Sequence, residues 1–145
     1  MALSDEQIAA AIMPTGLYNV KCRNLRRMCR ALLEDQGGVV PSKREGLMSL
    51  PGVGRKCADI VLDFTFGQAT VAVETHVHRV CNRLDLAGGK TEEQTAKSLE
   101  SRLPTEFLSD GHVLILPHGK RICMARAPKC DECLLADLCE ALTKR

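Results

Sequence analysis

The sequence lacks tryptophan, and aromatic residues make up only 3% of its 145 positions. It shows no secretion signal and no apolar run long enough to cross a membrane, so we expect neither export nor membrane insertion. It also lacks a strong excess of one charge, with a formal net charge of +2. Any binding of nucleic acid must therefore depend on local basic patches. Its 45% hydrophobic and 26% charged residues are typical of a globular chain that buries a core.

Cysteine, by contrast, is abundant: the chain has eight. Four are scattered through predicted helices, whereas the other four crowd the C-terminal region as Cys123, Cys130, Cys133 and Cys139. A secreted disulfide scaffold would need an export signal and an oxidising compartment. A tight group of four cysteines in a reducing cytosol instead indicates a metal or iron–sulfur site.

Apolar periodicity and helix-start signals predict an all-α protein without internal repeats. Three pairs fit the capping box: Ser4 with Gln7, Ser42 with Glu45 and Thr91 with Gln94. Helices are expected over residues 4–13, 20–35, 42–50, 55–66, 74–86, 91–103 and 105–116, with a last helix from about 134. Residues 68–73 are β-branched but have no partner strand, so we interpret them as an extended connector. Asp59 and Asp63 are expected on the outer face of their helix.

A two-glycine turn lies between two predicted helices, in the segment Leu50-Pro51-Gly52-Val53-Gly54. Without a Cβ, the backbone can approach a ligand closely, and the following helix offers free N–H groups and a positive dipole end. A plain helical corner without a ligand is the alternative. Because Arg55 and Lys56 follow the turn directly, we favour a phosphate site.

Lys56 and Glu74 are candidates for chemistry. A lysine is most often a solvated surface charge, but Lys56 lies in the first turn of a helix beside Arg55. Both the neighbouring charge and the helix dipole disfavour the ammonium form, which favours a nucleophilic amine. An amine that attacks the anomeric carbon of a sugar displaces a base and leaves an imine. Glu74, at the start of the next helix, is the candidate acid–base partner, and a simple helix-terminal acid is its alternative interpretation.

The C-terminal spacing Cys123-x6-Cys130-x2-Cys133-x5-Cys139 suits either zinc or a [4Fe–4S] cluster, with disulfides as a third option. Four basic residues and no acid occur between positions 120 and 129: Lys120, Arg121, Arg126 and Lys129. A basic loop that a metal holds in place is suited to phosphate contacts. Alternatively, these charges offset a negatively charged cluster.

Four parts of the chain match one known family in order and spacing: LPGVGRK, AVETHVHRVCNRL, HGKRIC and the C-terminal four-cysteine pattern. From Gly16 to Cys139 the sequence closely resembles endonuclease III, a family of helix-hairpin-helix DNA glycosylases with an iron–sulfur cluster. The resemblance implies a partial helical barrel with the hairpin in residues 1–68. It places the catalytic acid helix and the four-cysteine loop in a cluster lobe of residues 69–145. It also implies a [4Fe–4S] cluster, with zinc as the second candidate.

The function that this resemblance implies is base excision repair. We expect a DNA glycosylase with AP-lyase activity on oxidised pyrimidines and abasic sites in double-stranded DNA, located in the cytoplasm at the nucleoid. Lys56 would form the Schiff base with the deoxyribose, followed by β-elimination, and Glu74 would stand at the position of the catalytic acid. The expected DNA contacts are Leu17, which inserts into the base stack, the hairpin residues Leu50, Gly52, Val53, Gly54 and Arg55, and the basic residues Lys120, Arg121, Arg126 and Lys129.

The chain departs from the family in three places. The family has Asp where this chain has Glu74, and we expect the longer side chain to cap its helix poorly. The family's N-terminal helices have no counterpart before Met1, so we expect a truncated or reduced form, or another subunit that covers the exposed face. Pro117 falls inside a family helix and is expected to kink or end it, with a loop from His118.

The sequence is also compatible with two other functions. A DNA-binding iron–sulfur protein without catalysis would keep the hairpin and the basic loop. An iron–sulfur sensor or electron carrier would need only the cluster.

Overall fold

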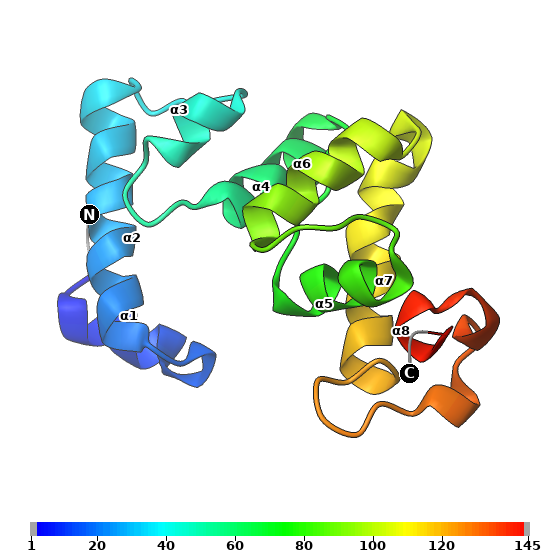
Figure 1. The fold of residues 1–145 in the computed structure, drawn as a ribbon. Coiled ribbons are helices and arrows are strands. Elements are labelled where there is room, and N and C mark those ends of the chain that lie inside the picture. Colours follow the sequence, from blue (N-terminus) through cyan, green and yellow to red (C-terminus); the bar gives the residue numbers. More distant parts are fainter. Residues whose placement is uncertain (1–2, 144–145) are drawn as a thin grey trace. The chain divides into compact units, whose positions relative to one another are not determined.

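The computed structural model describes residues 3–143 and separates the chain into two compact units, Met1–Gly54 and Arg55–Arg145 (Figure 1). Within the described residues all regular structure is helical, which confirms the predicted all-α class. The predicted division into a partial helical barrel of residues 1–68 and a cluster lobe of residues 69–145 has a different boundary and stays a prediction.

The first unit contains α1 (Asp5–Ile12), the 3₁₀ turn η1 (Met13–Thr15), α2 (Tyr18–Asp35) and α3 (Arg44–Met48). The capping box at the start of α1 is confirmed, because the Ser4 hydroxyl accepts from the Gln7 N–H while the Gln7 side chain accepts from the Ser4 N–H. The predicted Ser42 box is wrong. Lys43 has an extended backbone and is the N-cap of α3, so the helix begins too late for that box.

The second unit contains α4 (Arg55–Phe66), α5 (Thr75–Leu84), α6 (Glu92–Arg102), η2 (Thr105–Phe107) and α7 (Leu108–Arg121). Short elements follow: η3 (Cys130–Glu132), η4 (Ala136–Leu138) and α8 (Glu140–Thr143). The last helix therefore begins at Glu140, later than predicted. Residues 68–73 form a connector without helix or strand, as expected of a segment with no partner strand. Val71 and Val73 of this connector pack into one core with Val77, Cys81, Ala87, Ala96, Leu99 and Leu108.

The cap of α6 is half of the predicted box. The Thr91 hydroxyl accepts from the Gln94 N–H at 3.2 Å, as expected. The Gln94 side chain, however, accepts from the Lys90 N–H at 2.8 Å, one residue before the N-cap. The helix start is therefore predicted correctly, although its second hydrogen bond goes to a different donor.

Helix α7 runs through Pro117 to Arg121, so the expected break at Pro117 is wrong. Proline has no N–H to donate to the carbonyl four residues earlier. That carbonyl belongs to Val113, which is half exposed. Beyond the proline the last turn is held together, because the N–H groups of Ile122 and Cys123 both donate to the His118 carbonyl at 2.9 Å.

Asp59 is buried rather than on the outer face of α4, and its side chain is 0% exposed. It forms an ion pair one turn apart with Arg55, with 3.3 Å between Asp59 Oδ2 and Arg55 Nε. Arg55 also donates to Glu100 of α6 at 2.7 Å. Arg55 thus links the start of α4 to α6 through two carboxylates. An aspartate is rarely buried unless it is paired with a cation. The sequence pattern does not reveal that Arg55 pairs with Asp59, so it does not predict the burial of Asp59.

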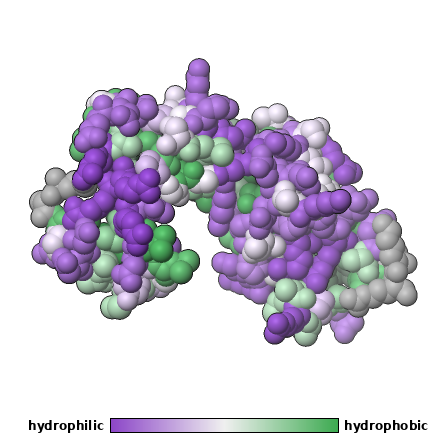
Figure 2. Space-filling model, turned by 60° about the vertical axis from the view of Figure 1, so that its left-hand side comes forward, coloured by the Kyte–Doolittle hydropathy of each residue, from purple (hydrophilic) through white to green (hydrophobic). Residues whose placement is uncertain are grey.

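Hydrophilic residues dominate the visible surface, and hydrophobic patches interrupt it (Figure 2). Across the described helices none combines the length and apolarity that a membrane span requires.

We expect Arg55→Ala to lower the free energy of unfolding by about 3–5 kcal/mol, because it leaves the buried Asp59 carboxylate without its guanidinium. The double variant Arg55→Met/Asp59→Leu removes both charges and should recover much of this loss. Urea unfolding measures both values. Arg102→Ala, at the exposed end of α6, is the matched control. An Arg55→Ala loss no larger than that of this control would contradict the role of the pair.

Candidate functional site

The hairpin in the first unit is a tight turn, closed by a hydrogen bond of 3.1 Å from the Val53 N–H to the Leu50 carbonyl. Pro51 precedes Gly52, whose φ of 82° lies in the left-handed region, as in a type II turn. A Cβ on Gly52 would lie 2.8 Å from Asn24 Cβ of α2, so only glycine fits there. Leu50 is 5% exposed, so a DNA contact at this position would come from its backbone and not from its buried side chain.

Leu17 stands out in the same unit because it is apolar, 78% exposed and left-handed, with a φ of 49°. It is the N-cap of α2, which begins two residues earlier than predicted because the Leu17 carbonyl accepts from the Lys21 N–H at 3.0 Å. A left-handed conformation costs a non-glycine residue about 1–2 kcal/mol. The structure therefore presents this leucine to solvent at a local cost.

Lys56 and Arg55 open α4 but have different surroundings. Lys56 is exposed in the first helical turn, as a nucleophile must be. The Arg55 side chain is only 15% exposed and is engaged by Asp59 and Glu100. Because the Arg55 guanidinium attaches α4 to α6, the group that Arg55 can offer to DNA is its backbone N–H at the helix start.

Glu74 is the N-cap of α5, and the expectation that it caps poorly is wrong. Its Oε1 accepts from the N–H groups of His76 and Val77, both at 2.9 Å, and its Oε2 accepts from the Thr75 hydroxyl at 3.2 Å. The extended Glu74 backbone, with φ −131° and ψ −179°, lets the longer side chain fold back onto these donors. Partial burial raises the pKa of Glu74, but the hydrogen bonds from Val77 and His76 outweigh it, so the pKa is lowered overall.

Two arginines of α5 donate hydrogen bonds to the start of the cysteine loop, the segment of residues 122–139 that carries the four C-terminal cysteines. Arg83 Nη1 donates to Cys123 Sγ at 3.3 Å and to the Met124 carbonyl at 2.7 Å. Arg79 donates to the carbonyls of Cys123 at 2.9 Å and Gly119 at 2.6 Å. The helix that Glu74 caps therefore also positions this loop.

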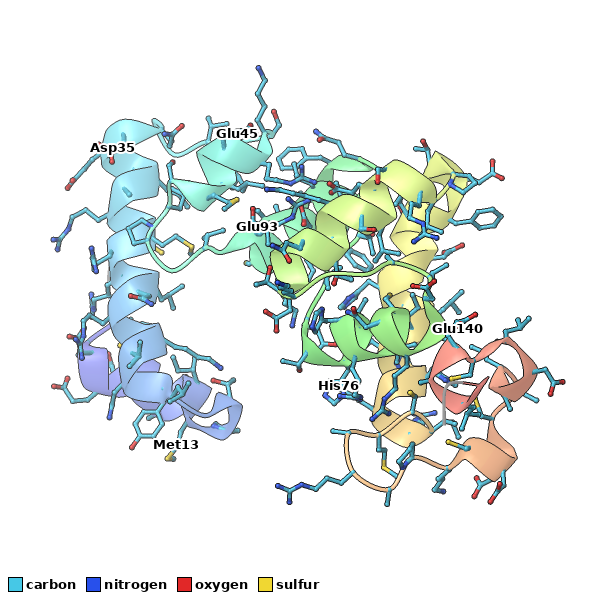
Figure 3. All side chains as sticks on the ribbon, in the orientation of Figure 1. Met13, Asp35, Glu45, His76, Glu93 and Glu140 are labelled. Carbon is cyan, nitrogen blue, oxygen red and sulfur yellow. The ribbon has the colours of Figure 1, made fainter. Side chains whose placement is uncertain are left out.

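His76 completes this set, because Arg79 Nη2 donates to His76 Nδ1 at 3.0 Å. His76 projects from the first turn of α5 (Figure 3). The sequence reasoning missed the roles of Arg79, Arg83 and His76. The one available signal was the spacing of Arg79 and Arg83, which places two charges on one face of a helix whose other face is apolar.

The four C-terminal cysteines line one cavity together with Arg83 and His118. Their role as ligands of one metal site stays a prediction. All eight cysteines of the chain fall within the described residues and are free thiols. Four thiols around one cavity are the donor set that either zinc or a [4Fe–4S] cluster requires. Within residues 3–143 the side chains form no group of three or more His, Cys, Asp or Glu already arranged to hold a metal ion.

The other cysteines have different surroundings. Burial raises the pKa of Cys81 to about 11, so this thiol is an inert part of the core. Cys22 is buried as well, whereas Cys57 is exposed on α4.

The four predicted basic contacts are all exposed, but they do not all lie in a loop. Lys120 and Arg121 belong to the last turn of α7, whereas Arg126 and Lys129 lie in the loop that follows. The Lys129 N–H closes this loop by donating to the Ile122 carbonyl at 3.0 Å, and its ammonium pairs with Glu132 at 3.5 Å.

Residues 1–105 match the HhH-GPD superfamily of base excision DNA repair proteins, and residues 123–139 match the iron–sulfur binding domain of endonuclease III. Endonuclease III of Escherichia coli strain K12 is 46% identical over 140 residues, which are 97% of this chain and 66% of that protein. The Haemophilus influenzae protein is 45% identical over 138 residues, 95% of this chain and 65% of that one.

Solved structures agree. A trapped endonuclease III–DNA covalent intermediate superposes with a TM-score of 0.89 at 37% identity, covering 99% of this chain and 68% of that chain. A thermostable thymine-DNA glycosylase gives a TM-score of 0.81 at 28% identity over the same shares. These matches confirm the predicted helix-hairpin-helix glycosylase fold and support a [4Fe–4S] cluster as the cofactor. The chain spans about 66% of the length of the curated relative from Escherichia coli.

We expect Glu74→Ala to destabilise the fold by about 1 kcal/mol at pH 7, as the loss of a helix cap does. Because the pKa of Glu74 is lower in the folded state than its ordinary 4.5, its carboxylate stabilises the fold above pH 4.5. This contribution is lost as the pH falls through the folded-state value. Urea unfolding from pH 7 to pH 3 should therefore show the difference between wild type and variant shrinking in the acid range. Glu92→Ala, in the first turn of α6, is the control, and a constant difference would contradict the capping role.

Proposed function

The chain belongs to the HhH-GPD superfamily of base excision DNA repair proteins, and we propose that it is an endonuclease III-type DNA glycosylase with AP-lyase activity. Its proposed substrates are oxidised pyrimidines and abasic sites in double-stranded DNA, and we place it in the cytoplasm at the nucleoid, where that substrate lies. The observation that carries the proposal is Lys56: an exposed amine in the first turn of α4, directly after the Gly52–Gly54 hairpin.

The proposed reaction begins with the neutral Lys56 amine attacking C1′ of the damaged nucleotide. The bond from C1′ to the base breaks, and the base leaves with a proton. The C1′–O4′ bond of the sugar ring then breaks, O4′ takes up the second proton of the amine, and a Schiff base joins Lys56 to C1′. Removal of a proton from C2′ then expels the 3′ phosphate and nicks the strand. Water hydrolyses the Schiff base and restores the lysine.

Glu74 fits the role of a carboxylate that stays ionised through this sequence. Its lowered pKa makes it a poor proton donor at neutral pH, but a suitable stabiliser of positive charge that develops at the sugar. Two N–H groups hold its Oε1, which fixes the orientation of the carboxylate. Oε2 accepts the longer bond from the Thr75 hydroxyl and is the oxygen better suited to face a substrate.

We propose that the DNA is bound by groups that take no part in the chemical steps. The proposed phosphate contacts of the hairpin are backbone groups from Leu50 to Arg55, because the Gly52–Gly54 turn carries little side-chain bulk. Leu17 suits the space that an extruded base leaves in the stack, since it is exposed and held at the N-cap of α2. The proposed phosphate contacts of the second unit are Lys120, Arg121, Arg126 and Lys129.

The proposed ligands of the [4Fe–4S] cluster are Cys123, Cys130, Cys133 and Cys139, which line one cavity. Bound there, the cluster supplies iron–thiolate bonds that cross-link an irregular segment of the chain. Arg83 then lies beside a negatively charged sulfur, which its guanidinium helps to neutralise.

Borohydride trapping on a labelled duplex with one abasic site tests the proposed chemistry. We expect a covalent adduct and strand nicking with the wild type, and loss of both with Lys56→Gln. Glu74→Gln should slow nicking by about 10²–10³-fold, and Glu74→Asp should recover most of the lost rate. Lys97→Gln, on the exposed face of α6, is the charge-matched control. Absence of a wild-type adduct, or an adduct that survives Lys56→Gln, would refute lyase activity and leave a DNA-binding protein.

The cluster is tested separately on anaerobically purified protein. We expect absorbance near about 400 nm and about four irons and four sulfides per chain. Cys123→Ser and Cys139→Ser should each reduce this content strongly, whereas Cys29→Ser and Cys57→Ser should not. A colourless protein with about one zinc per chain would overturn the assignment.

A further inference from the structure

Three arginines on one face of α2 have no partner within the described chain. Arg23, Arg27 and Arg30 follow one another at intervals of four and three residues, which places them on one helix face. All three are exposed, and no hydrogen bond or ion pair joins them to residues 3–143. Arg26 of the same helix differs, because it pairs with Asp5 and donates to the Leu3 carbonyl. We call Arg23, Arg27 and Arg30 the arginine stripe.

The stripe borders the two DNA-binding features proposed for this unit. Asn24, next to Arg23, is the residue against which Gly52 of the hairpin packs. Arg27 lies one turn further along from that contact. Leu17 caps the start of the same helix. The stripe therefore runs along the helix that connects the exposed leucine to the hairpin.

The dimensions of the stripe suit a nucleic-acid backbone. Seven residues of α-helix rise about 10.5 Å. One strand of a duplex carries a phosphate about every 3.4 Å along the axis, so this length corresponds to about three phosphates. Arginine also presents several N–H donors that match phosphate oxygens.

The charges near the stripe favour an external anion as its partner. Like charges one turn apart on a helix are destabilising by about 0.2–0.5 kcal/mol per pair, and the stripe contains two such pairs. Lys21, on the same helix, adds a further cation and donates to the Thr15 carbonyl. Glu34 is the one acid in line with the stripe, one turn beyond Arg30.

We propose that the arginine stripe of α2 binds the phosphates of duplex DNA beside the lesion, without reading sequence or damage. The proposal rests on the proposed function for the identity of its partner, but it needs no chemical step. It adds a contact surface to the hairpin and the basic residues around the cysteine loop.

The salt dependence of binding tests it. The probes are an undamaged duplex and the same duplex with a stable abasic analogue, in potassium chloride between roughly 50 and 300 mM. For Arg23→Gln/Arg27→Gln/Arg30→Gln we expect the slope of log K against log salt to fall by about 2–3, since each phosphate contact contributes about 0.9. Both duplexes should lose affinity equally, because phosphate contacts carry no information about the base.

The charge-matched control is Lys90→Gln/Lys97→Gln/Arg102→Gln, which removes three cations from exposed positions in and before α6. Its slope should change by less than one unit. A stripe slope equal to that of the wild type or the control, or a loss confined to the abasic duplex, would overturn the proposal.

Two further measurements keep the test valid if the triple variant folds poorly. Arg27→Gln alone should lower the slope by about one unit. Glu34→Gln removes the acid in line with the stripe and should raise affinity about threefold at low salt. A Glu34→Gln variant with unchanged or weaker binding would count against the stripe. If borohydride trapping fails but the slopes shift as expected, the arginine stripe is supported and the lyase assignment is refuted. If trapping succeeds but the slopes do not shift, the lyase assignment is supported and the stripe is refuted.

Discussion

The cap that Glu74 places on α5 is the interaction on which the candidate site depends. The same helix of ten residues carries, on successive turns, the two arginines that hold the start of the cysteine loop. A helix of that length is about 15 Å long and does not bend easily. Its capped end therefore fixes the carboxylate, while its other end fixes Cys123, in one rigid element. Because the core residues Val77 and Cys81 lie on the opposite face, the packing of the second unit also sets the direction of this helix.

The electrostatics of α5 follow from its dipole. The positive N-terminal end meets the ionised Glu74 carboxylate, and the negative C-terminal end has Arg83 in its last turn. The helix dipole therefore stabilises both charges in the free protein, without a ligand. This explains why the longer glutamate serves as a cap at all: two backbone N–H groups and the dipole act on the same carboxylate. Compared with aspartate, the extra methylene of Glu74 changes the path of the side chain. The carboxylate that interacts with the N-terminal end of α5 carries the same charge.

Local chemistry could be predicted from the sequence, whereas distant partners could not. The Pro51-Gly52 turn and the Ser4 cap depend on neighbours within three residues, and both are as expected. Arg79 and Arg83 meet partners that lie far along the chain, around Cys123, which no local pattern reveals. The engagement of the Arg55 guanidinium was missed for a related reason: its carboxylates are Asp59, expected to be exposed, and Glu100 on another helix. Pro117 differs, because a proline removes one donor but does not prevent a helix that packing and the following turn support.

The charges at the two ends of α5 stabilise that helix, whereas several features of α2 raise the free energy of the folded unit. Leu17 adopts a left-handed conformation and leaves 78% of its surface in water, so it has neither a backbone nor a burial advantage there. The arginine stripe sets like charges one turn apart without an internal acid to pair with each. Backbone strain of the kind seen at Leu17 clusters at sites that bind ligands. One ligand, duplex DNA, would compensate both features. Its stacked bases would surround the inserted Leu17 side chain, and its phosphates would pair with the arginine stripe. The proposed binding of duplex DNA would account for both features, and both occur on the helix whose Asn24 contacts the hairpin.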